Sequence, residues 1–358
     1  MSASVNVDRL RSVLRHEGRP GPVPFIELFA DQEIMEAVLG HPMVPADSGE
    51  PQAIRAHGDS LIAFYQGLGY AYVPVGPSVP WKRVTVAGRD TALLPRDARQ
   101  WDNSTTVLIK DWADFEAYPW PRPEEFNYAL AEYVVSHLPE GMGAIGMGTG
   151  GVLEWVMWLM SYELFAVAIY DSPDLVQAMF DKVTKVLTAA CRGLLDMGGF
   201  CAYFVGDDLG HSGGTMISPR LMRQYVFPNQ RQLADTAHQH GVPYLLHACG
   251  NLSLVMDDLI ESVTIDAKHS FEDKIEPVED LHARYGRRIA LLGGVDMDLL
   301  ARGSEPAVRA RTRQLLGALG DSGSWGLGTG NTVANYIPLA NYLAMLDEGR
   351  RWNREHYG

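Results

Sequence analysis

The stretch VPYLLHAC, residues 242–249, is an apolar run that follows a glycine and ends in a histidine and a cysteine. A short, almost continuous apolar run is typical of a buried strand in a parallel sheet. Successive side chains of a strand point to opposite faces, so His247 and Cys249 are expected to point the same way. The end of this strand therefore predicts two potential metal ligands side by side.

Seven further runs of this kind occur along the chain, and helix-length segments separate them. Two of the predicted helices start at Ser172-Pro173 and Ser218-Pro219, a serine cap followed by proline in the first turn. Eight alternations of strand and helix predict an α/β fold, a single (β/α)8 TIM barrel that spans residues 1–358 as one domain. The other predicted strands are 23–29, 70–76, 143–148, 201–208, 263–270, 288–296 and 324–331.

Two segments stand apart from this alternation. Residues 77–140 form a long insertion between the second and third strands, which we expect to supply a loop and extra helices over one end of the barrel. The apolar stretch 152–170 contains Glu154 and Glu163, so we interpret it as a buried helix and not as a membrane span. Trp155, Trp158 and Tyr162 recur there at helical spacing and are expected in the core.

The composition limits the classes of partner. The 358 residues carry 44 acidic and 30 basic side chains, a net charge of −14, and no basic block. Binding to nucleic acid or to an anionic membrane is therefore not expected, and small molecules or proteins are the expected partners. Three widely spaced cysteines and a start without a signal-peptide pattern predict a soluble, cytoplasmic protein. The oligomeric state does not follow from the sequence.

Polar side chains gather at the predicted strand ends. In TIM barrels these ends open onto one face, where the catalytic groups lie. The side chains in question are Glu27, Asp207, Asp208, His247, Cys249, His269, Asp296 and Asn331.

Each of these residues also has a purely structural interpretation. His247 and Cys249 could be an ordinary buried pair, because one HxC lacks the second pair that makes zinc-finger spacing specific. Glu27 and Asp296 could pair with arginines, and His269 could be a hydrogen-bonding partner behind the site.

The segment GMGTGG, residues 146–151, matches the GxGxxG pattern of dinucleotide-binding turns. Its strand is very short, and it belongs to the third of eight units. A Rossmann domain usually begins with this motif, so we do not expect a nucleotide site here.

The segments LLHACGN (245–251), IDAKHSFED (265–273), ALLGGVDMDLL (290–300) and GLGTGNTVANYIPLANYLAML (326–346) resemble the uroporphyrinogen decarboxylase superfamily. That superfamily contains the haem-pathway decarboxylases and zinc-dependent methyltransferases that serve corrinoid proteins or coenzyme M. The resemblance covers nearly the whole chain and implies a TIM barrel.

Departures from the decarboxylase pattern point to the methyltransferase branch. True decarboxylases have arginines after the first strand, an aspartate at the end of the second and a histidine in an LGHG motif on the last. Here ELFADQEIMEAV has no arginine, the second strand ends in Val75-Gly76-Pro77, and the last reads Leu327-Gly328-Thr329-Gly330. A tetra-acidic macrocycle would lose these contacts.

The methyltransferase branch implies zinc held by HxC and by a second cysteine from the last strand. His247 and Cys249 match the HxC, but Thr329 to Asn331 occupy the place of the second cysteine. A zinc site would therefore need a ligand such as Asp208, Glu154, His269 or Asp296. The catalytic candidates are Asp208, His269, Asp207 and Asp296, and the substrate-binding candidates are Glu27, Glu154, Asn331 and Thr329.

The resemblance implies transfer of a methyl group from a small methylated substrate to the corrinoid of a separate protein. This chain has no DxHxxG corrinoid motif, since Asp208 and His211 are one residue too far apart. One alternative is a metal-independent decarboxylase or lyase that acts on a smaller acid than the porphyrinogen. A relative that only binds a ligand is the other alternative.

Overall fold

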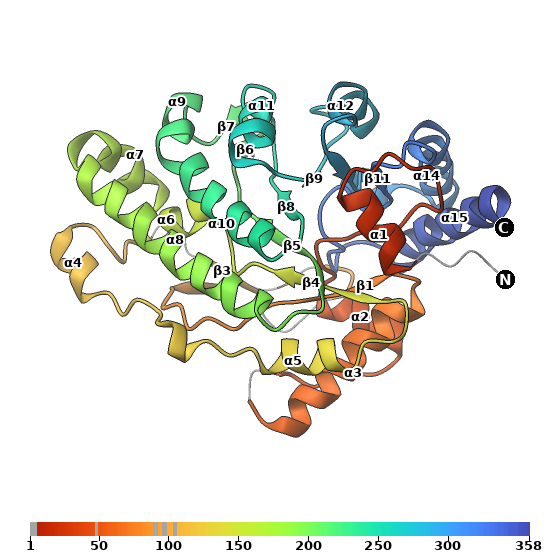
Figure 1. Ribbon diagram of the computed structural model, residues 1–358, viewed down its shortest axis with the longest axis horizontal. Helices are drawn as coiled ribbons and strands as arrows, with labels where there is room; N and C mark the ends of the chain where they lie inside the picture. Colours follow the sequence, from red (N-terminus) through yellow and green to blue (C-terminus); the bar gives the residue numbers. More distant parts are fainter. Residues whose placement is uncertain (1–5, 47–48, 89, 91, 95–98, 103–105) are drawn as a thin grey trace.

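A parallel β-sheet forms the centre of the molecule (Figure 1). The computed structural model describes residues 6–46, 49–88, 90, 92–94, 99–102 and 106–358. Within these residues the sheet has seven strands in the order β1-β4-β5-β8-β9-β10-β11, all paired in parallel. The strands are β1 (Tyr72–Val75), β4 (Gly143–Met147), β5 (Phe200–Gly206), β8 (Tyr244–His247), β9 (Ala267–His269), β10 (Ala290–Leu292) and β11 (Trp325–Gly326).

The first predicted strand, residues 23–29, fills the eighth position as an irregular segment. An isolated parallel bridge pairs Phe25 with Leu327, just after β11, and a second bridge pairs Ala30 with Val333. On the other side of this segment, the Tyr72 hydroxyl donates to the carbonyl of Glu27 and accepts from its N–H, at 2.8 and 2.7 Å. All eight predicted strand positions are therefore occupied, and the predicted TIM-barrel class is confirmed.

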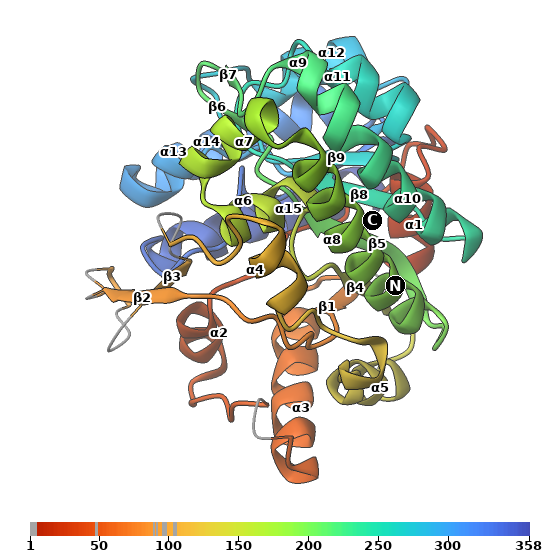
Figure 2. The same ribbon diagram turned by 90° about the vertical axis from the view of Figure 1, so that its left-hand side faces the viewer.

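Helices surround the strands in the arrangement that parallel crossovers require (Figures 1 and 2). The predicted starts at Pro173 and Pro219 are confirmed, and the apolar stripe of the helix from 173 is buried. The helices are α1 (Val7–Leu14), α2 (Gln32–Leu39), α3 (Pro51–Gly67), α6 (Val152–Met160), α7 (Tyr162–Asp171), α8 (Pro173–Leu195), α9 (Pro219–Leu221), the π-helical turn η2 (Met222–Val226), α10 (Phe227–Gln239), α11 (Met256–Asp258), the π-helical turn η3 (Leu259–Val263), α12 (Val278–Tyr285), α13 (Met297–Arg302), α14 (Glu305–Leu319) and α15 (Leu339–Tyr357).

The insertion after β1 contains short helices, as predicted, and also a β-hairpin that was not predicted. These are β2 (Thr85–Gly88), β3 (Arg99–Asp102), α4 (Trp112–Ala117), η1 (Pro123–Glu125) and α5 (Ala129–Ser136). The hairpin extends away from the barrel in Figure 2. Trp81 stacks on Trp155 of α6 at 4.0 Å, and the Leu94 N–H donates to the Asn335 carbonyl, beyond β11. The insertion thus packs over the C-terminal end of the barrel, where the chain leaves β4 and β11. A second hairpin, β6 (Gly210–His211) with β7 (Gly214–Thr215), follows β5.

The stretch 152–170 differs from the single helix predicted for it. Ser161 has a φ of 62°, and at this residue the chain bends by 95° between α6 and α7. Trp155 is buried as expected, whereas Tyr162 lies after the bend and is 42 % exposed. In the part of the chain that the structure describes, no single helix has the length and apolarity to cross a bilayer, and only the bent pair α6 and α7 meets that test jointly.

Tyr72 provides a test of how the first segment is held in the barrel. Its hydroxyl is fully buried and pairs both backbone groups of Glu27, so Tyr72→Phe leaves an N–H and a carbonyl without partners. We expect the free energy of unfolding to fall by about 1–3 kcal/mol in urea denaturation. Tyr133→Phe is the control, because its hydroxyl bonds to Asp59 at the surface. An equal loss in both variants would contradict this role of Tyr72.

Candidate active site

A pocket of about 770 Å³ opens at the C-terminal ends of the strands. Its walls come from the ends of β1, β4, β5 and β8, from the chain after β11, from residues 28–30 and from helices such as α2 and α3. TIM barrels place their chemistry at this face. One part is apolar and includes Leu28, Met35, Leu61 and Met147. The polar part contains five predicted site residues: Glu154, Asp208, His247, Cys249 and Asn331. Among the described residues that line it, none is lysine or arginine.

The other five predicted residues lie outside the pocket wall. Four of them are completely or almost completely buried: His269, Glu27, Thr329 and Asp207. Hydrogen bonds connect them to the lining, from His269 to His247, from Asp207 to the Glu154 N–H, and from Glu27 through Thr329 to Asn331. Asp296 caps helix α13, where its Oδ1 accepts the N–H groups of Asp298 and Leu299. These hydrogen bonds stabilise the start of α13. A catalytic role of Asp296 stays a prediction.

Two histidines lie together inside the barrel. The Nδ1 atoms of His247 and His269 are 2.7 Å apart, so one ring must donate to the other. Burial, together with the nearby Lys268 charge, lowers the pKa of His247 to about 3. The pKa of His269 is also well below its usual range, because of burial and then the charges of His247 and Lys268. Both rings are therefore neutral at pH 7, the form in which imidazole binds metals.

The direction of the hydrogen bond between the histidines decides what His247 presents to the pocket. If His247 donates from Nδ1, its Nε2 carries a lone pair toward Cys249. In this tautomer His269 fixes the ring of His247 from behind, as second partners of metal-bound histidines usually do. Nε2 of His269 is buried and has no hydrogen bond of ordinary geometry. The nearby backbone of Thr329 opposes part of the decrease in the pKa of His269.

The thiol of Cys249 is surrounded by polar groups. Its Sγ lies 3.3 Å from Nε2 of His247, 3.3 Å from Nδ2 of Asn331 and 3.5 Å from Oγ of Ser270. The Asp208 carboxyl group is also close enough for the thiol to lower its pKa. Burial raises the pKa of the thiol, and the hydrogen bond from Ser270 opposes the increase. In the absence of a cation the neutral thiol is thus the favoured form.

Asp207 and Asp208 are adjacent but have different roles. Asp207 is fully buried and accepts the N–H groups of Leu153 and Glu154 at the start of α6 and an amide hydrogen of Gln230. Burial raises its pKa to about 6, and these hydrogen bonds limit the increase. Asp208 faces the pocket. Its pKa is raised by burial and lowered in part by the Cys249 thiol.

The start of α6 is also where GMGTGG would hold a phosphate. Here Asp207 takes two of the free N–H groups, and Glu154 accepts the N–H of Gly151 at 3.0 Å. A Cβ on Gly151 would lie about 2.2 Å from the Asp207 carboxyl, so the glycine permits this close approach. Three N–H groups that a nucleotide phosphate could use are thus bonded to carboxylates, and the absence of a nucleotide site stays a prediction.

Glu154 is the second carboxyl group in the pocket. Burial raises its pKa well above its ordinary value, and the neighbouring charges of Asp207 and Asp208 raise it further. These surroundings therefore favour the protonated form of this acid, which faces the pocket.

Glu27 lies below the pocket and joins the first segment to the last. Its Oε1 accepts the N–H of Thr329 at 2.9 Å, and its Oε2 lies 2.6 Å from the Thr329 hydroxyl, which is 3.0 Å from the Asn331 carbonyl. One hydroxyl hydrogen cannot serve two acceptors fully. A protonated Glu27 resolves this, because it donates to Thr329 Oγ1, which then donates to Asn331. Burial raises the pKa of Glu27 to about 8, in agreement with the neutral form.

Two residues of the site were not among those predicted. Ser270 has a φ of 83°, unusual for a residue with a side chain, and contacts the thiol. Lys268 is a fully buried lysine behind the same strand ends. The signal for Lys268 was present in the sequence IDAKHS, where a charged residue interrupts an apolar strand.

The residues present suit a metal ion in part. Over the described ranges, no group of three or more His, Cys, Asp and Glu side chains is arranged to hold a metal. However, Nε2 of His247 and Sγ of Cys249 are 3.3 Å apart, near the distance of about 3.6 Å that two ligands of a tetrahedral zinc ion have. The neutral imidazole and the thiol form a donor pair of the right chemistry, and a third ligand must come from a small movement of a neighbour such as Asp208.

Comparison with known proteins agrees with this architecture. A model of the family "Uroporphyrinogen decarboxylase (URO-D)" matches residues 104–352. The chain therefore belongs to the uroporphyrinogen decarboxylase family.

Individual relatives are distant in sequence. Uroporphyrinogen decarboxylases of Pseudomonas paraeruginosa and Pseudomonas aeruginosa are each 21 % identical over 263 residues, which cover 70 % of this chain and 71 % of theirs. Among solved structures, a methyltransferase from Methanosarcina mazei superposes with a TM-score of 0.69 at 17 % identity and covers 99 % of both chains. At this identity the likeness establishes the fold.

The protonated state of Glu27 predicts a pH dependence of stability. Between its ordinary pKa of 4.5 and the folded value of about 8, only the unfolded chain loses the proton, so the free energy of unfolding falls as pH rises through this window. The slope is at most about 1.4 kcal/mol per pH unit. Glu27→Gln is permanently neutral and keeps the same hydrogen bonds, so its advantage over the wild type should grow from about pH 5 to 8 in urea denaturation.

Glu27→Ala separates this charge effect from simple loss of the side chain. It leaves a cavity and an unpaired Thr329, so it should be less stable than the wild type at every pH. If Glu27→Gln and the wild type show the same pH dependence, Glu27 is ionised in the folded protein.

Proposed function

We propose that this protein is a methyltransferase that moves a methyl group from a small methylated substrate, such as a methoxylated aromatic compound, to the corrinoid of a separate protein, with zinc at His247 and Cys249. The observation that carries the proposal is the approach of His247 Nε2 and Cys249 Sγ to 3.3 Å at the wall of the barrel pocket. The fold shared with the Methanosarcina mazei methyltransferase supports it.

Three side chains would hold the metal. His247 would supply a neutral nitrogen, Cys249 a thiolate, and Asp208, whose carboxyl group lies near the thiol, a carboxylate oxygen. When bound, zinc supplies Lewis-acid chemistry that withdraws charge from the atom that leaves the methyl group. The side-chain amide of Asn331 donates a hydrogen bond to the sulfur of Cys249.

The rest of the pocket binds the substrate and controls protons. The apolar wall of Leu28, Met35, Leu61 and Met147 can bury the body of a small organic substrate and exclude water from it. Burial and the neighbouring carboxyl groups favour the protonated form of Glu154, which faces the pocket and in this proposal donates the proton that the leaving atom requires. His269 lies behind His247 and orients it, and we give it no direct contact with substrate.

The charge of the pocket argues against decarboxylation of a smaller acid as the alternative. Such an enzyme must hold a substrate carboxylate, and arginine or lysine normally does this. The described lining offers Glu154 and Asp208 instead, and neither can attract an anion. Zinc content separates the two functions directly.

Replacement of Cys249 tests the proposal. We expect Cys249→Ala to bind no stoichiometric zinc and to lose methyl transfer to a reduced corrinoid, while its Tm stays close to that of the wild type, because the side chain lies at the wall of the pocket. Cys249→Ser should bind zinc more weakly than the wild type, since a hydroxyl stays protonated at neutral pH. Metal is measured by elemental analysis after dialysis against zinc.

Cys201→Ala is the matched control. That thiol is fully buried next to Gly143, away from the pocket, so its loss should lower stability slightly and leave zinc content unchanged. A wild-type protein that takes up no zinc, or full activity in Cys249→Ala, would refute the proposed function.

A further inference from the structure

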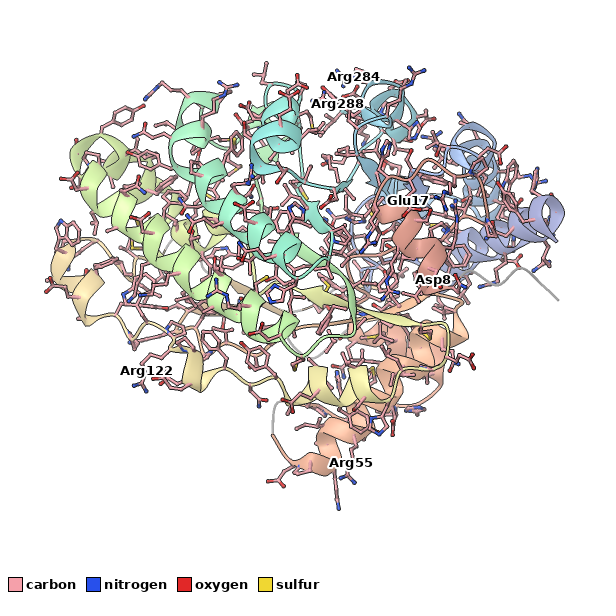
Figure 3. The ribbon with its side chains drawn as sticks, in the orientation of Figure 1. Asp8, Glu17, Arg55, Arg122, Arg284 and Arg288 are labelled. Atoms are coloured by element: carbon pink, nitrogen blue, oxygen red, sulfur yellow. The ribbon has the colours of Figure 1, made fainter. Side chains whose placement is uncertain are left out.

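A lysine side chain lies buried directly behind the candidate metal centre. Lys268 in the middle of β9 is 3 % exposed, and its neighbour His269 points to the opposite face, into the barrel. Charged side chains such as Arg284, Arg288 and Arg122 lie at the periphery of the molecule (Figure 3). No carboxylate of the described residues forms an ion pair with Lys268. Burial lowers its pKa to about 8.

Backbone carbonyl groups take the place of a counter-ion. The Nζ atom donates to the carbonyl oxygens of Ser270 at 2.6 Å and of Ala248 and His269 at 3.3 Å. An ammonium group has three hydrogens, so these contacts use all of them. The ring of Phe271 lies 4.6 Å from the nitrogen and adds a cation–π contact.

The carbonyls that Lys268 holds belong to the residues that shape the thiol site. Ala248 is the single residue between His247 and Cys249, so its carbonyl orients the main chain that carries both. Ser270 has a φ of 83°, a strained conformation for a residue with a Cβ, and in this conformation its Oγ donates to Sγ of Cys249. The shortest contact of the ammonium, at 2.6 Å, is with this strained residue.

We propose that Lys268 is a positioning residue for the His247–Cys249 centre, whose ammonium group holds the main chain at Ala248 and Ser270 and so fixes the direction of the Cys249 thiol. The inference builds on the proposed function, in which this thiol binds zinc. It concerns the shape of the site and not the chemistry performed there.

Lys268→Met tests this role, because methionine fills the same space without a donor. In the metal-free protein we expect faster hydrogen–deuterium exchange confined to the segments around 248–252 and 269–273. With Co²⁺ as the probe, we expect a changed d–d and thiolate-to-cobalt spectrum and binding weaker by about tenfold to a hundredfold, the usual effect of losing a partner behind the metal ligands.

Asn353→Leu is the matched control for general loss of stability. Asn353 is also buried and also holds backbone groups, the N–H and carbonyl of Val23, but at the opposite end of the first segment. It should lower the Tm without any change in the cobalt spectrum or in exchange around Cys249. If Lys268→Met resembles Asn353→Leu in both measurements, Lys268 has only a structural role and the inference is wrong.

Ser270→Gly provides a second and more specific test. Glycine adopts the same φ without strain, so the ammonium group is no longer needed to hold this conformation. The effect of Lys268→Met on cobalt affinity should therefore be smaller in the Ser270→Gly background than in the wild type. Equal effects in the two backgrounds would overturn the proposed link through Ser270.

The two proposals fail in different ways. If the wild type binds neither Zn²⁺ nor Co²⁺, the proposed function is refuted, while local exchange in Lys268→Met still decides whether the lysine holds the two segments. If the wild type binds metal and Lys268→Met has the wild-type spectrum, affinity and exchange, the positioning role is refuted and the proposed function stands.

Discussion

The hydrogen bonds between Glu27 and Thr329 connect the first segment of the barrel to the last, and the shape of the site depends on them. The first segment has isolated bridges to the chain after β11 in place of a continuous strand ladder, and side chains such as Tyr72 and Asn353 bond its backbone, so side chains complete the closure. A buried carboxylate would be costly here, and the protonated acid removes that cost. From Thr329 the same network continues to Asn331, whose amide contacts Cys249. The hydrogen bonds that close the barrel are thus connected to those that position the Cys249 thiol.

Neutral forms of ionisable groups predominate on this side of the barrel. Burial favours the protonated forms of Glu27 and Glu154 and the neutral forms of His247 and His269. A site built in this way has low internal charge until a cation enters. Entry of a divalent ion would favour ionisation of the Cys249 thiol, whose neutral form burial otherwise favours, so metal binding would release a proton.

The positions of the strands could be predicted from the sequence because most of the buried strands are short apolar runs bounded by glycine, proline or polar residues. His247 and Cys249 were predicted for the same reason, since their spacing of two places both on one face. The bend at Ser161 could not be predicted, because a serine with positive φ leaves no mark in the apolar pattern of residues 152–170. The partners of Asp207 and Glu27 were equally hidden, since Gln230, Leu153 and Thr329 lie 23, 54 and 302 positions away in the chain.

Asn331 shows how the loss of one ligand can change a site without destroying it. At the position where the resemblance implies a second cysteine, the amide of Asn331 contacts the remaining thiol at 3.3 Å and brings no charge. In the proposed centre, Asp208 restores the missing negative charge, so that one zinc ion, one thiolate and one carboxylate sum to zero. A carboxylate oxygen is harder than a thiolate sulfur and donates less charge to the metal. The resulting zinc would be more loosely held but a stronger Lewis acid, which suits the breaking of a bond to oxygen better than the binding of a thiol.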